Sequence, residues 1–126
     1  MSYKYVVKKN LEFEIAVEKF KDSIEKVGLK VVAEVMPSQK IKKMLNIDIP
    51  PYKVLFVCHP RYIYEMMKMN YDVGTLVPCH AVVYVRNGET YVGVELSSEK
   101  LKPCDAKLAE YIKDAERKMI KAVNMV

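Results

Sequence analysis

The sequence predicts a single α+β domain of two layers, in which a mixed β-sheet is covered mainly on one face by helices. Three observations lead to this prediction. The chain of 126 residues is long enough for one hydrophobic core but not for two, so we expect residues 1–126 to form one domain. Its apolar positions switch between period two, typical of strands, and a period near 3.6, typical of helices. An Asn-Gly pair between two alternating runs predicts a β-hairpin.

The N-terminal segment predicts a strand, a helix and a second strand. Tyr3, Tyr5 and Val7 alternate with other residues as in a half-buried strand. Asn10 is expected to cap the following helix, and Gly28 is expected to end it. Residues 29–36 predict the second strand. The buried stripe of the helix is expected to consist of Phe13, Val17, Phe20, Ile24 and Val27.

The middle of the chain predicts a short helix, a strand and a longer helix. Ser38 is expected to cap the short helix, whose apolar side is Ile41, Met44 and Leu45. The apolar run over residues 54–58 predicts a strand that is buried on both faces. Residues 61–69 predict a methionine-rich helix that is apolar around most of its circumference. Such a helix is expected either to lie within the core or to contact a partner.

The C-terminal part predicts a hairpin and a last helix. A two-residue turn at Asn87-Gly88 places Tyr84 opposite Tyr91 and His80 opposite Glu95. One face of this hairpin should belong to the core: Cys79, Ala81, Val83, Val85, Val92, Val94 and Leu96. The other face should be wetter or contact a partner, and it carries His80, Val82, Tyr84, Arg86, Glu89, Tyr91 and Glu95. A helix capped by Asp105 follows, so the expected order is βαβαβαββα.

The composition favours a cytoplasmic protein without membrane or nucleic-acid partners. No apolar segment resembles a signal peptide or a membrane span. Three cysteines are an odd number, which argues for reduced thiols rather than a disulfide framework. The net charge of +5 is small. Its densest cluster, Lys40, Lys42 and Lys43, is too short for a stripe that binds phosphate backbones.

Reactive side chains concentrate in two Cys-His pairs that adjoin prolines. Cys58-His59 precedes Pro60, and Cys79-His80 follows Pro78. Cys58 is expected between the end of a strand and the start of a helix, where a thiol pKa can be lowered. The alternative is a buried cysteine that fills space. If the two strand ends lie at the same level, Cys58 and Cys79 could form a redox pair or bind a metal.

The spacing of these four side chains is unfavourable for a single zinc ion. Consecutive strand residues point to opposite faces, so Cys79 and His80 reach one ion only if the strand is broken there. For His80, a hydrogen bond with Glu95 across the hairpin is the competing interpretation. The candidate ligand-binding residues are Cys58, His59, Cys79, His80 and Glu95. The first four are the metal candidates, and Cys58 is the candidate catalytic thiol.

Three short motifs occur in a familiar order and spacing: PYKVL at 51–55, CHP at 58–60 and GTLVPC at 74–79. With the strand and glycine turn that follow, they resemble the domain-of-unknown-function family 302. The resemblance is strongest over residues 40–97 and implies a small two-layer α+β domain, often a homodimer in crystals, without an established reaction. The usual Asn of this family is replaced by His59, and a variable position is His80. A role for either histidine would therefore belong to this protein rather than to the family.

The expected function is a homodimeric module that binds a small molecule or a metal ion near Cys58/His59 and Cys79/His80. One alternative is a thiol-dependent redox enzyme or sulfur carrier that uses Cys58. Another is a purely structural interaction protein. Neither a nucleophile-elbow motif nor a glycine-rich phosphate loop is present, so hydrolase and nucleotide-binding classes are disfavoured. No cofactor can be named from the sequence.

Overall fold

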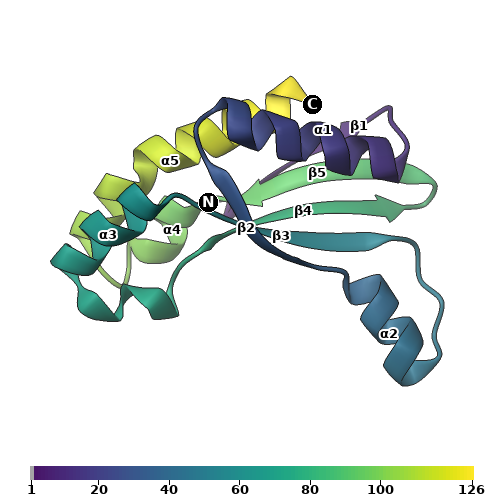
Figure 1. Cartoon of the computed structure of the whole chain (residues 1–126), viewed down its shortest axis with the longest axis horizontal. Helices are drawn as coiled ribbons and strands as arrows, with labels where there is room; N and C mark the ends of the chain where they lie inside the picture. Colours follow the sequence, from purple (N-terminus) through teal and green to yellow (C-terminus); the bar gives the residue numbers. More distant parts are fainter. Residues whose placement is uncertain (1) are drawn as a thin grey trace.

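The computed structural model describes residues 2–126, which form one α+β domain with a five-stranded sheet (Figure 1). The predicted order of strands and helices is confirmed, with a short additional helix, α4, and a 3-10 turn, η1. The elements along the chain are β1 (Lys4–Lys9), α1 (Phe13–Lys26), β2 (Lys30–Val35), α2 (Pro37–Leu45), β3 (Tyr52–Cys58), α3 (Pro60–Met69), η1 (Tyr71–Thr75), β4 (Cys79–Arg86), β5 (Glu89–Glu95), α4 (Ser97–Leu101) and α5 (Ala106–Met125).

The sheet is antiparallel throughout, so the expectation of a mixed sheet was wrong in this respect. The strand order is β1-β5-β4-β3-β2, and each neighbouring pair runs in opposite directions. We expected a mixed sheet because a helix between two strands often carries the chain back to the end of the sheet where the first strand began. The second strand then runs parallel to the first. Among the helices that connect strands, only α1 runs back along the sheet (Figure 1). The segments that contain α2 and α3 stay at the end where the preceding strand finishes, so the next strand reverses direction (Figure 1).

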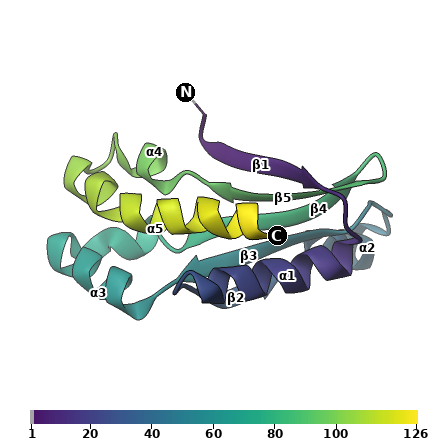
Figure 2. The same ribbon diagram turned by 90° about the horizontal axis from the view of Figure 1, so that it is seen from above.

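Helices cover one face of the sheet, as predicted. Figure 2 shows α1 and α5 side by side across this face, with α3 beside the N-terminal half of α5. The core lies between these helices and the sheet. Its largest fully buried side chains are Phe20, Ile24, Leu55, Met66, Leu101, Leu108, Ile112 and Met119. Within the described residues 2–126, the opposite side of the sheet, hereafter the open face, has no helical layer over its centre (Figure 1).

This one-sided cover explains why β3 is not buried on both faces. Leu55 and Val57 point into the core and are buried, whereas Val54 and Phe56 point to the open face and are half-buried. The apolar run of β3 therefore reflects a sheet with two apolar faces, of which the helices cover only one.

The hairpin and two of the expected helix ends are confirmed. Arg86 pairs with Glu89 and Tyr84 with Tyr91, while Asn87 and Gly88 have positive φ angles as the turn requires. Gly28 follows α1 with a φ of 88°. Asp105 caps α5, because its Oδ1 accepts hydrogen bonds from the N–H groups of residues 107 and 108.

Two expected N-caps were wrong. Glu12, not Asn10, precedes the first residue of α1, and its side chain makes no capping bond. Ser38 lies inside the first turn of α2, which begins at Pro37. The Ser38 hydroxyl instead accepts a hydrogen bond from the Tyr52 N–H at 3.0 Å and ties α2 to the start of β3.

Helix α2 projects away from the body on the side of the open face (Figure 1). Its apolar side is only partly covered, since Ile41 is half-buried but Met44 is 77% and Leu45 is 64% exposed. In the methionine-rich helix α3, Met66 is buried against the core, while Tyr64 and Met69 are exposed. Within residues 2–126, none of the helices has the length and apolar character needed to cross a membrane.

Candidate functional site

Cys58 and His59 lie where β3 ends and α3 begins. The Cys58 thiol is half-buried and donates to the carbonyl oxygen of its neighbour His59, with 3.6 Å between the heavy atoms. Burial raises the pKa of this thiol, which is the opposite of the activation expected for a helix N-terminus. His59 is the N-cap of α3, because its Nδ1 accepts the Arg61 N–H at 3.1 Å. The imidazole therefore performs the local structural role expected of asparagine at this position.

Cys79 lies at the start of β4 and is buried in the core. The Ser97 hydroxyl donates to its Sγ at 3.0 Å. Burial raises the pKa of this thiol to about 11. Cys58, His59 and Cys79 do line one common pocket, but this pocket holds only about 10 Å³ and its other walls are almost entirely apolar. It offers space for less than a bound water molecule, and neither thiol is favoured as a thiolate.

His80 lies on the other side of the sheet from Cys79, as strand alternation predicts. Its ring Nδ1 is 3.0 Å from Glu95 Oε1, so the predicted contact across the hairpin is confirmed. The sheet thus separates the candidate residues into two groups, with Cys79 facing the core and His80 and Glu95 on the open face. Across residues 2–126, no three His, Cys, Asp or Glu side chains are arranged to hold a metal ion.

The open face has a regular pattern that follows from strand pairing. Residues opposite one another on neighbouring strands form rows across the sheet, and successive rows on one face lie about 6.7 Å apart. Three rows matter here. The aromatic row is Tyr52, Tyr84 and Tyr91, the floor is Val54, Val82, Gly93 and Val6, and the polar row is Phe56, His80, Glu95 and Lys4.

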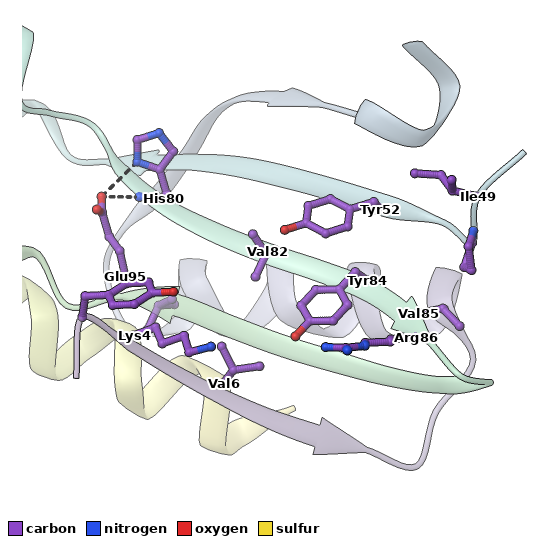
Figure 3. Close-up of a pocket in the computed structure, with 13 residues that line it drawn as sticks. Lys4, Val6, Ile49, Tyr52, His80, Val82, Tyr84, Val85, Arg86 and Glu95 are labelled. Carbon is purple, nitrogen blue, oxygen red and sulfur yellow. Dashed lines mark hydrogen bonds and ion pairs between the residues drawn. The ribbon is translucent and has the colours of Figure 1, made fainter. Parts of the chain in front are cut away.

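A groove of about 480 Å³ lies on this face, between the aromatic row and the polar row. Figure 3 shows Val82 on β4 between His80 on one side and Tyr84 on the other, with Val6 on the edge strand β1, beyond β5. Ile49 and Pro50, from the loop that follows α2, close the end of the groove near Tyr52. Because these walls come from β1, β3, β4, β5 and this loop, the groove exists only in the complete fold.

The tyrosines of the aromatic row stack on one another. The ring centroids of Tyr52 and Tyr84 are 5.2 Å apart, and those of Tyr84 and Tyr91 are 5.3 Å apart. The interplanar angles are 12° and 17°, so Tyr84 has a ring over each of its faces. Its edge and hydroxyl remain available to a molecule in the groove.

Sequence reasoning placed the hairpin residues of this groove on one face but did not predict the groove itself. The Asn-Gly turn placed Val82, Tyr84, His80 and Glu95 on one hairpin face. The contributions of Tyr52, Lys4 and Val6 depend on which strands flank the hairpin, and no local signal specifies that pairing. The alternation of Tyr3, Tyr5 and Val7 predicted the strand itself but not its partner.

Comparisons with known proteins agree with this fold. The family model described as "Domain of unknown function DUF302" matches residues 3–126. A crystal structure described as an uncharacterized conserved protein DUF302 from Bacillus stearothermophilus is similar, with a TM-score of 0.92 and 24% sequence identity. That similarity covers 99% of this chain and 98% of the other. Among curated proteins, none matches this chain.

Proposed function

Since this chain belongs to the DUF302 family, whose description carries no activity, we propose a function from its own geometry: it is a homodimeric module that binds a small organic molecule on the open face of its sheet. The ligand lies in the groove between the aromatic row and the polar row. His80 and Glu95 remain site residues in this proposal, whereas Cys58, His59 and Cys79 do not.

The groove itself is the observation that carries the proposal. Its volume of about 480 Å³ lies within the range of about 300–1,000 Å³ that is usual for small-molecule sites. Its surface combines an apolar base around Val6 and Val82 with a few polar groups at its margins. This combination is typical of sites in which apolar contact supplies affinity and a small number of hydrogen bonds fix orientation.

A metal site or a thiol site receives less support. The two thiols and His59 surround a pocket of about 10 Å³, which leaves no room for a substrate beside them. Burial raises the pKa of Cys58 and of Cys79, so neither is prepared as a nucleophile near neutral pH. The thiol-dependent alternative therefore depends on a reactivity that the surroundings of Cys58 do not favour.

Exposed apolar side chains near the groove support the dimeric part of the proposal. Met44, Leu45 and Ile47 are each at least half exposed on the projecting α2 and the loop after it. The same loop reaches the groove through Ile49, which is 39% exposed. Several exposed apolar side chains on one segment are characteristic of interaction sites, and a second copy would cover them symmetrically.

Native mass spectrometry of the untagged protein tests the proposal, since it reports bound molecules and chain number together. We expect a dimer that carries additional mass, released on denaturation. Val82→Trp should fill the groove and remove this mass, whereas Val32→Trp, at an exposed position outside the groove, should retain it. Bare chains in the native spectrum, together with no chemical-shift change at Val82 or Tyr84 on addition of 2-naphthol, would overturn the proposal.

A further inference from the structure

Two pairs of opposite charges lie across the strands of the open face, yet neither pair forms an ion pair. Lys4 on β1 is opposite Glu95 on β5, and Arg86 is opposite Glu89 beside the hairpin turn. Cross-strand neighbours of opposite charge usually attract one another. Within residues 2–126, however, neither Lys4 nor Arg86 takes part in an ion pair.

Glu95 is turned away from Lys4 because other donors hold its carboxylate. Its Oε1 accepts the backbone N–H of His80 at 2.8 Å and Lys100 Nζ at 3.1 Å. Figure 3 shows this carboxylate directed to His80 and the Lys4 side chain extending in another direction. Lys100 does not line the groove, so it balances the charge of Glu95 from outside.

Glu89 is likewise occupied and leaves Arg86 without a carboxylate. One of its oxygens accepts Lys8 Nζ at 3.1 Å, and the other accepts the Tyr91 hydroxyl at 3.2 Å. Lys8 also lies outside the groove. Each glutamate is therefore neutralised by a lysine that is not its cross-strand neighbour, and the charges of Lys4 and Arg86 remain uncompensated.

The two uncompensated cations both line the groove. Lys4 lies in the polar row, and Arg86 lies one row beyond the aromatic row, so they are on opposite sides of the floor. Figure 3 shows both side chains extending toward Val6 from these two directions. The ring of Tyr3 has its centroid 5.6 Å from Lys4 Nζ, a contact that favours this position of the ammonium group.

The other side of the groove is apolar. Val82 lies on its floor, and Ile49 and Pro50 close it near Tyr52, on the side toward β3. A ligand that matches both sides has an apolar body and an anionic group. A carboxylate suits this cationic side, because a planar guanidinium binds a planar carboxylate through two parallel hydrogen bonds.

We infer that the groove takes a small organic carboxylate, with its anionic group between Lys4 and Arg86. The apolar body lies over Val82, on the side toward Ile49. This inference rests on the proposed function and specifies the ligand class of the same site. The carboxylate supplies both cations with the partner that the two glutamates do not provide, and the positive potential disfavours cationic ligands.

Two naphthalene probes of similar shape test the inference. 2-Naphthoate is anionic at neutral pH, and 2-naphthamide is its neutral counterpart. We expect 2-naphthoate to bind about three- to tenfold more tightly, because hydrogen bonds to a charged group are stronger than those between neutral groups. Titrations that follow the chemical shifts of Val82 and Tyr84 measure both dissociation constants in the groove.

Charge-removing variants locate the effect. Arg86→Gln and Lys4→Gln each keep a polar side chain at an exposed position, so the fold should be retained. Each should weaken the binding of 2-naphthoate by about three- to tenfold and leave 2-naphthamide unchanged. Lys30→Gln, at an exposed position on β2 outside the groove, is the matched control for the loss of one positive charge and should change neither affinity.

The Nε–H resonance of Arg86 in the wild-type protein gives a second measurement that does not depend on a variant. We expect 2-naphthoate to shift this resonance more than 2-naphthamide does at equal occupancy. Equal affinity for both probes, or an equal response of Arg86 to both, would overturn the ligand class but leave the proposed function intact. If neither probe nor 2-naphthol changes the shifts of Val82 and Tyr84, the ligand class fails, and with bare chains in the native spectrum the proposed function fails as well.

Discussion

Val6 occupies the space in which a side chain at Gly93 would lie. The two residues are paired across β1 and β5, and a Cβ atom built on Gly93 would be 2.5 Å from Val6 Cγ2. It would also lie 3.1 Å from the Val6 Cα. The close approach allows Val6 to rest over the backbone of β5 and to form part of the groove floor.

Gly93→Ala should therefore displace β1. We expect a loss of about 1–3 kcal/mol in the free energy of unfolding, as for other overpacked positions. Gly74→Ala is the matched control, because a Cβ there would meet no atom within 4 Å. Urea denaturation of the two variants measures the difference. Equal stabilities would show that β1 adjusts freely at this position.

The three cysteines should differ in their rates of alkylation. Cys104 is exposed, Cys58 is half-buried with a raised pKa, and Cys79 is buried with a pKa raised to about 11. We expect Cys104 to react first near neutral pH and Cys79 to react only as the protein unfolds. Mass-resolved labelling over a pH series measures these rates, with Cys104→Ser as the control for assignment. Faster labelling of Cys58 than of Cys104 would instead support the thiol-dependent alternative.

Glu34 should make the stability of the protein sensitive to acid. Its carboxylate contacts Lys21 at 2.6 Å and Lys53 at 3.0 Å, which lowers its pKa below the ordinary value of 4.5. Because the folded-state pKa is the lower one, this stabilisation is present above pH 4.5 and is lost as the pH falls through the folded-state value. The side chain is about one-third exposed, so solvent screening limits the effect to less than about 1 kcal/mol.

Thermal denaturation of Glu34→Gln should accordingly show a lower Tm than the wild type near neutral pH. The difference should disappear in strong acid, where the wild-type carboxyl is protonated as well. Glu14→Gln, at an exposed position on α1, serves as the control for the loss of one negative charge. A Tm difference that persists unchanged in acid would show that the ion pairs are not its cause.

His59 provides a test that separates a structural role from a functional one. Since its Nδ1 caps α3, His59→Ala should lower the free energy of unfolding by about 0.5–1 kcal/mol. Asparagine is a stronger cap, so His59→Asn should retain or exceed wild-type stability. Chemical denaturation measures both effects. If His59→Asn is stable but loses the additional mass that the wild type carries in native mass spectrometry, His59 has a role in binding beyond capping.

The exposed residues of α2 should control assembly. Light scattering of the wild type at tens of micromolar should give twice the mass of one chain. Replacing Met44 and Leu45 with glutamate places two charges on the exposed surface and should give monomers, because burying these charges is unfavourable. Ile15→Glu, at an exposed apolar position on α1, should remain dimeric. A monomeric wild type would remove the dimer from the proposed function.

The predictable parts of this structure are those encoded by neighbouring residues. Asn87-Gly88 determines the hairpin register, and that register alone brings His80 to Glu95. The strand order is a different problem, because Tyr52 reaches Tyr84 and Val6 reaches Gly93 only through pairings between distant segments. The direction of β3 relative to β2 depends on whether the connection through α2 crosses the sheet. The short amphipathic pattern of α2 does not specify this.

Local competition explains the errors at individual side chains. Ser38 has the right chemistry for a cap, but the Ser38 hydroxyl accepts a hydrogen bond from the backbone N–H of Tyr52 instead. The Cys-His pairs looked like one site because they are adjacent in sequence. Strand alternation already predicted that Cys79 and His80 point to opposite faces of the sheet. In the structure, Cys79 is buried on the core face and His80 lies on the open face.

The separation of β1 from β5 along the chain has a consequence for the order of folding. β4 and β5 are joined by two residues and can pair early, whereas pairing of Tyr5 with Val94 requires closure of a loop that contains most of the protein. We therefore expect β1 to join the sheet late. Lys4 and Val6 complete the groove only at that step, so an occupied groove would hold the two ends of this long loop together and slow the first opening of the sheet.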